Sequence, residues 1–111
     1  MAIHHANPLE IIHLQPLGSK IGITKTHTLF KTDAIEAIRL VMPAGKKLAE
    51  HKAPGEITVQ CLKGCIKFTA KGAEHEMNAG DMLYLEVSEP HAVEAVTDAS
   101  VLLTILLSKA S

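Results

Sequence analysis

Two histidines, His51 and His91, stand where a turn leads into a β-rich segment, in "AEHKAPGEITVQCLKG" and "SEPHAVEA". Imidazole is the commonest metal ligand in proteins, and it also makes hydrogen bonds. Alternate residues of a strand face the same side, so His51 would share the interior of a sheet with Ala53. Neither Ala53 nor Ile57, the next interior positions, can ligate a metal. Two imidazoles leave a divalent ion short of the three or four protein ligands that catalytic sites use.

Three nearby residues, Glu56, Gln60 and Cys61, could add to the pair. Glu56 is one residue away from the interior position and faces the other side, unless a bulge at Pro54-Gly55 turns it inward. Gln60 has outward parity and would meet a second subunit. Cys61 has inward parity and is either a soft ligand for zinc or copper(I) or a buried apolar thiol. The histidines themselves are either weak metal ligands or interior histidines with no ion.

The elements that carry these residues are short apolar runs bounded by Gly, Pro, Asn and Asp. Such runs, with turn residues about every ten positions, predict strands rather than helices. The expected strands are residues 34–42, 46–51, 57–63, 65–70, 74–78, 82–87, 91–96 and 101–107. Many short strands at even spacing are typical of a sandwich or barrel. We therefore expect one all-β domain over residues 31–111.

Residues 1–30 contain two prolines and two glycines and show no sustained period. We interpret them as an N-terminal arm that covers a sheet edge or a partner subunit, because an open edge invites aggregation. The arm holds four of the seven histidines, and a further one lies in an expected hairpin. We expect all five to face solvent or an interface: His4, His5, His13, His27 and His75.

Composition limits the partners of this 111-residue chain. Eleven basic and twelve acidic residues give a net charge of −1, so no positive field would attract nucleic acid or an anionic membrane. The longest apolar stretch, "VLLTILL", is too short to span a bilayer. Cys61 and Cys65 are the only cysteines, and no signal-like segment precedes them. We therefore expect a cytoplasmic protein with free thiols and a small-molecule ligand.

From Pro43 to Leu107 the chain resembles a small single-domain cupin of the RmlC-like jelly-roll type. The first cupin motif is G-x5-H-x-H-x3-E-x6-G, and the second is G-x5-P-x-G-x2-H-x3-N. At the motif positions this chain has Gly45, His51, Ala53, Ile57 and Gly64, and then Gly80, Glu86, Ser88, His91 and Ala95. The resemblance implies a double-stranded β-helix with His51 and His91 inside one open end.

Three functions are compatible with this resemblance. The first is a cupin that binds a small molecule beside His51 and His91, with at most a weakly held divalent metal. The second is a metal-dependent cupin enzyme of the dioxygenase or isomerase type, in which the two histidines ligate Zn, Fe, Mn or Ni. The third is a structural dimer module without activity. The resemblance and the apolar residues on both faces of the last strand predict a homodimer.

Overall fold

The computed structural model describes residues 5–14 and 24–107, which contain strands and turns only. The all-β prediction is confirmed, and the expected runs match strands β2 to β9 to within two residues at each end. The strands are β1 (His27–Lys31), β2 (Ile35–Met42), β3 (Lys47–His51), β4 (Ile57–Lys63), β5 (Cys65–Ala70), β6 (Ala73–Asn78), β7 (Met82–Leu85), β8 (His91–Ala95) and β9 (Ala99–Leu106). Nothing in this part of the chain forms a helix long and apolar enough to cross a membrane.

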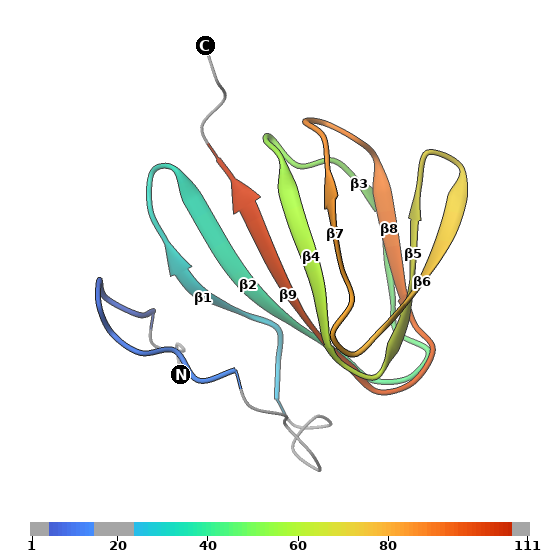
Figure 1. Cartoon of the computed structure of the whole chain (residues 1–111), viewed down its shortest axis with the longest axis horizontal. Coiled ribbons are helices and arrows are strands. Elements are labelled where there is room, and N and C mark those ends of the chain that lie inside the picture. Colours follow the sequence, from blue (N-terminus) through green and yellow to red (C-terminus); the bar gives the residue numbers. More distant parts are fainter. Residues whose placement is uncertain (1–4, 15–23, 108–111) are drawn as a thin grey trace.

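The strands form two antiparallel sheets that face each other (Figure 1). The first sheet has the order β1-β2-β9-β4-β7, and the second has the order β3-β8-β5-β6. Most neighbours are distant in sequence: β2 pairs with β9, β3 with β8 and β4 with β7. These nested pairings are the jelly-roll arrangement expected from the sequence.

The core lies between the sheets and is filled by alternate residues of the strands. In β4 the side chains of Ile57, Val59 and Cys61 are 2, 1 and 0% exposed, whereas Thr58 and Gln60 are half-buried on the other face. This alternation confirms the expected parity of the strand. Phe68 of β5 is the largest fully buried side chain, and the remaining core is mainly aliphatic. Aliphatic residues suit strands because branched side chains pack well on a pleated surface.

Two tight turns between strands require glycine because of their backbone conformation or close packing. Gly64, between β4 and β5, has φ +81°, and a Cβ there would lie 2.1 Å from the carbonyl oxygen of Asp98. Any side chain at this corner would therefore displace the backbone that carries β8 into β9. Lys71 and Gly72 join β5 to β6 with φ of 53° and 73°. Positive φ at both central residues is the two-residue turn that suits the twist of a hairpin.

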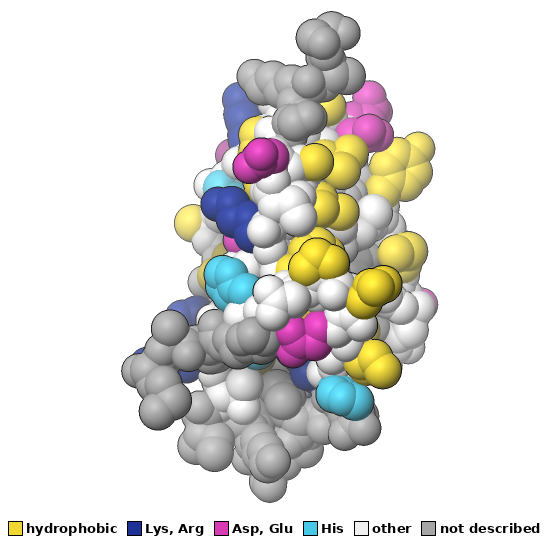
Figure 2. All heavy atoms as spheres, turned by 90° about the vertical axis from the view of Figure 1, so that its left-hand side faces the viewer, with side chains coloured by type: hydrophobic (Ala, Val, Ile, Leu, Met, Phe, Trp, Pro, Cys, Tyr) yellow, Lys and Arg dark blue, Asp and Glu magenta, His cyan; other side chains and the backbone are white. Residues whose placement is uncertain are grey.

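Strand β1 crosses the expected boundary between arm and barrel at residue 30. It pairs with β2, with an irregularity between Thr28 and Phe30. Within the arm, the N–H of Ala6 donates to the carbonyl of Leu29 at 2.8 Å, so this segment lies against β1, the edge strand of its sheet. Figure 2 looks at this side of the molecule and shows hydrophobic side chains in a band over it. Leu9 and Ile11 of the arm are both largely exposed.

Candidate functional site

A cavity of about 210 Å³ lies between the two sheets. Its walls come from the inner faces of both sheets and from the residue before β1. The lining residues are Thr26, Ile38, Leu40, Leu48, His51, Val59, Phe68, His91, Val93, Leu103 and Ile105. All but Thr26 and the two histidines have hydrocarbon side chains. The Thr26 hydroxyl accepts a hydrogen bond from the N–H of Val41 at 2.9 Å, so the imidazoles are the main polar groups available to a guest.

The two histidines meet in this cavity, as the sequence predicts. His51 ends β3 and His91 begins β8, and the two residues are directly paired in the antiparallel register. Their ring centroids are 4.3 Å apart, with an interplanar angle of 63°. Cross-strand neighbours on one face interact directly, so the two rings act as one group at this end of the cavity.

Each ring is held by its own backbone. Nδ1 of His51 lies 2.9 Å from the carbonyl oxygen of Ala49, and Nδ1 of His91 lies 3.0 Å from that of Glu89. A carbonyl oxygen can only accept, so Nδ1 carries the proton in both rings. In a neutral imidazole the other nitrogen, Nε2, then has a free lone pair. The same anchoring through the second nitrogen orients histidines that ligate metals.

A bulge in β3 brings His51 to the cavity. Leu48 pairs with Val93 and His51 pairs with His91, so three steps along β3 match two steps along β8. Without the extra residue, Leu48 and His51 would face opposite sides of the sheet. With it, both line the cavity. Sequence analysis by a strict period of two missed Leu48 and Thr26 as lining residues.

His91 is the more buried of the pair, at 2% exposure, whereas His51 is exposed on one side. The His91 ring stacks on Phe68 with centroids 5.5 Å apart and planes within 12°. Burial lowers the pKa of His91 below its ordinary value, and the nearby His51 ring acts in the same direction, while the bond to Glu89 opposes them. A buried imidazole resists protonation because its charged form loses hydration.

Glu56, Gln60 and Cys61 do not line the cavity. Glu56 is exposed, and Ile57 takes the interior position, so no bulge turns the carboxylate inward. Gln60 pairs with Met82 and Leu102 and is half-buried. Cys61 is buried, and its Sγ donates to the carbonyls of Lys63 and Gly64.

The donor set does not fit a resident catalytic metal. Burial raises the pKa of the Cys61 thiol, which opposes the thiolate that a metal requires. No group of three His, Cys, Asp or Glu side chains that could hold an ion occurs within residues 5–14 and 24–107. His51 and His91 supply two ligands, and the walls around them are hydrocarbon. A catalytic ion takes three or more protein ligands, so ligation by this pair alone would be weak.

The other described histidines do not line this cavity. His5, His13 and His75 are exposed, as expected. His27 is half-buried in β1, and its Nδ1 contacts the carbonyl of Lys25 at 2.8 Å. His4 lies outside the described residues.

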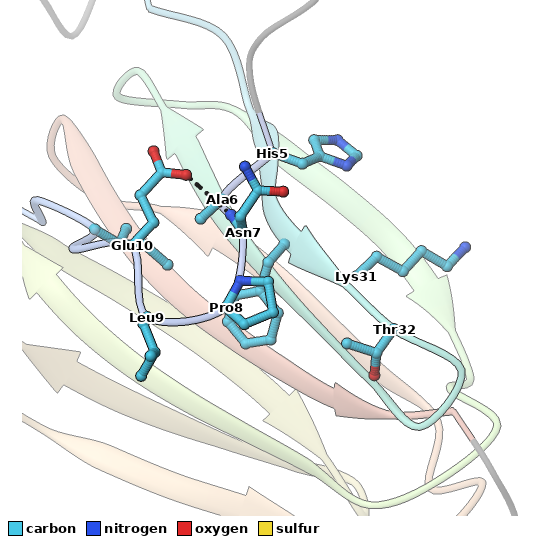
Figure 3. A pocket seen from close by; sticks show the side chains of 10 residues that line it. His5, Ala6, Asn7, Pro8, Leu9, Glu10, Lys31 and Thr32 are labelled. Carbon is cyan, nitrogen blue, oxygen red and sulfur yellow. Dashed lines mark hydrogen bonds between the residues drawn. The ribbon is translucent and has the colours of Figure 1, made fainter.

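A larger hollow of about 570 Å³ lies beside β1, between the arm and the end of the strand (Figure 3). The N–H of Asn7 donates to Glu10 at 2.9 Å, and this bond closes a turn of the arm. Leu9, at the tip of the turn, is among the lining residues and is fully exposed. The hollow is more open to solvent than the cavity between the sheets and contains neither His51 nor His91, so that cavity is the better candidate site.

Solved structures share this fold, some over almost the whole chain and others over part of it. A conserved protein of unknown function from Streptococcus pyogenes is 20% identical, with a TM-score of 0.77, and 99% of this chain and all of that chain are covered. An RmlC-like cupin from Desulfovibrio desulfuricans is 26% identical, with a TM-score of 0.67, and 94% and 96% of the chains are covered. A DMSP lyase from Ruegeria pomeroyi is 23% identical, with a TM-score of 0.66, and 76% of this chain and 46% of that chain are covered.

No curated protein matches this sequence. The sequence model of the cupin domain, however, matches residues 38–107, a span that runs from β2 to the end of β9. This span contains both cavity histidines and the nested strand pairs described above. The chain belongs to the cupin family.

Proposed function

We propose that this cupin binds a small, largely apolar molecule in the cavity between its sheets, beside His51 and His91. The observation that carries the proposal is the meeting of hydrocarbon walls with two anchored imidazoles in one cavity. Binding sites are typically concave and apolar, with a few placed polar groups that fix orientation. Free thiols at Cys61 and Cys65 fit the reducing cytoplasm in which we place the protein.

The cavity volume limits the ligand. An engineered cavity of about 150 Å³ holds benzene, so about 210 Å³ suits a guest of roughly seven to ten heavy atoms. Larger cofactors need the greater volumes, from about 300 Å³, of ordinary ligand sites.

The test is titration of the protein with toluene and phenol, followed by the amide spectrum in NMR. We expect saturable shifts at residues that line the cavity. Leu48→Phe, which fills the cavity from β3, should abolish them. Leu62→Phe is the matched control, because Leu62 is half-buried in β4 and does not line the cavity. Equal binding by both variants would place the guest elsewhere.

A second candidate is a metal-dependent enzyme of the dioxygenase or isomerase type. It is favoured by the anchoring of Nδ1 in both histidines, which leaves two Nε2 atoms free toward one cavity. It requires a further ligand beyond those that the described residues supply.

Elemental analysis of protein purified without a histidine tag and without residues 1–5 separates the two functions. About one ion per chain supports the enzyme, and none supports the binding protein. In a purely structural dimer module, Leu48→Phe would change nothing except stability.

A further inference from the structure

The cavity offers a guest hydrogen-bond acceptors rather than donors. In both His51 and His91 the ring N–H is already used, because Nδ1 donates to a backbone carbonyl. What remains on a neutral ring is the lone pair of Nε2. The Thr26 hydroxyl is engaged in both directions, since the N–H of Val41 donates to it at 2.9 Å and its own O–H donates to the carbonyl of Val41 at 3.5 Å. A guest that only accepts hydrogen bonds would therefore find no partner at this end of the cavity.

Geometry also favours neutral rings. His91 is 2% exposed and stacks on Phe68, and the His51 ring is its direct neighbour, with centroids 4.3 Å apart. A charge on one ring would lose hydration, and charges on both would repel each other in an apolar surrounding. No carboxylate lines the cavity to compensate them. An anionic guest could be paired only if one ring took up a proton at Nε2, and that charged ring would be costly to bury in this cavity.

The rings and walls also favour a flat guest. Phe68 and His91 lie within 12° of parallel and present aromatic surface to the cavity. The remaining walls are branched aliphatic side chains from both sheets, such as Leu40 and Val59 of the first and Val93 of the second. Aromatic rings that stack offset or edge-to-face attract each other beyond the effect of simple burial, so a flat aromatic guest gains from these two rings.

We infer that the cavity selects small planar molecules that carry a neutral hydroxyl donor, of the phenol class, with the O–H donating to Nε2 of His51 or His91. This inference rests on the proposed function and names the ligand class of the same site. The ring of the guest occupies the hydrocarbon part of the cavity, and its hydroxyl lies at the histidine end. No bond is made or broken.

The experiment compares two guests of the same size, toluene and phenol, which differ by a methyl group in place of a hydroxyl. Both are titrated into chelator-treated protein at pH 7.5, and dissociation constants are read from NMR shifts. An apolar cavity without an acceptor prefers toluene, because an unpaired hydroxyl is costly to bury. Here we expect phenol to bind at least about threefold more tightly than toluene, since one hydrogen bond contributes about 1 kcal/mol.

His91→Phe keeps an aromatic ring stacked on Phe68 and removes the Nε2 acceptor. His51→Phe likewise replaces the imidazole with a ring that has no acceptor. In the double variant the preference should reverse in favour of toluene by about tenfold or more. If these variants do not fold, the dissociation constants of phenol and toluene for the wild-type protein still test the inference. Toluene binding as tightly as phenol would overturn the inference and leave the proposed function standing. Benzoate binding more tightly than phenol would also overturn it, because that result requires a charged histidine. Binding of neither guest would remove the proposed function itself.

Discussion

His51 and His91 pair directly across β3 and β8, and each is tied through Nδ1 to the carbonyl two residues before it. The identical tether on both strands fixes both rings with Nε2 unprotonated in the neutral form. The pair therefore places two pre-oriented polar nitrogen atoms at one end of a cavity whose other walls are mainly hydrocarbon. Its consequences for metal, pH and stability can be measured separately.

For metal, we predict weak Zn²⁺ binding that depends on both rings. His51→Gln or His91→Phe should each lower the affinity at least about tenfold, because two ligands are already fewer than a stable site requires. Titration with a competing weak chelator measures this in protein that lacks residues 1–5, which removes His4 and His5. His75→Gln on β6 is the matched control and should change nothing. Tight binding in a His51→Gln/His91→Phe double variant would assign the metal to another site.

For pH, we predict that His91 makes the protein less stable in mild acid. An unfolded histidine titrates near pH 6.5, and burial lowers the pKa of His91 in the folded state. Between these two values the unfolded chain binds more protons, so the free energy of unfolding increases with pH. The contribution is complete above about pH 6.5 and is lost as the pH falls through this window.

Chemical denaturation of the wild type and of His91→Phe between pH 8 and pH 5 measures this contribution. The wild type should lose more stability than the variant as the pH falls. The groups nearest His91 are His51 and Glu89, and neither is changed in the variant. Parallel pH profiles for the two proteins would contradict the prediction.

Ser88 gives a third prediction. Its φ is +61°, a left-handed conformation that disfavours residues with a Cβ, at the position where the cupin motif has glycine. Ser88→Gly should therefore stabilise the fold by about 0.5–1 kcal/mol, as measured by denaturant unfolding. Ser88→Ala retains the Cβ and serves as the control, without a gain of this size. A loss of stability in Ser88→Gly would show that the Ser88 side chain itself holds the loop that leads into His91.

The outer faces of the two sheets differ, and this difference predicts how a homodimer forms. On the second sheet, residues of alternating charge lie opposite one another across all four strands: Lys47, Glu94, Lys67 and Glu76. On the first sheet, Met82 and Tyr84 of β7 are 61% and 70% exposed, and Leu106 of β9 is 41% exposed. Apolar side chains gathered on one face are typical of an interface, so we predict pairing through the first sheet.

Tyr84→Glu combined with Met82→Lys should convert the dimer to a monomer in light scattering. Glu76→Lys on the opposite face is the control and should leave the dimer intact. A wild-type mass that matches one 11.9 kDa chain at every concentration would refute the prediction.

Strands β2 to β9 could be predicted from the sequence, because each of the seven turns between them contains glycine, proline, asparagine or aspartate at a point where a period-two pattern stops. β1 could not. Only Leu29 of its five residues is buried, and the irregularity between Thr28 and Phe30 interrupts the alternation. An edge strand with one inward residue has almost no periodic signal.

The meeting of His51 and His91 could be predicted from motif positions, but the composition of the cavity could not. The bulge in β3 moves Leu48 to the same side as His51, and no residue type in "KKLAEH" specifies that extra step. Thr26 reaches the cavity from outside any expected strand. Both contributions depend on pairing with partners more than ten residues away, which a local pattern does not contain.

The position of β9 has a consequence for synthesis. β9 is the last of the strands along the described chain, yet it lies in the middle of its sheet, between β2 and β4. During translation, neither β2 nor β4 can pair with β9 until residues 99–106 have been added and have left the ribosome. The β5–β6 hairpin, joined by the Lys71-Gly72 turn, can form much earlier. The edges of β2 and β4 that β9 covers therefore stay unpaired in the nascent chain until residues 99–106 are available, which favours aggregation during that interval.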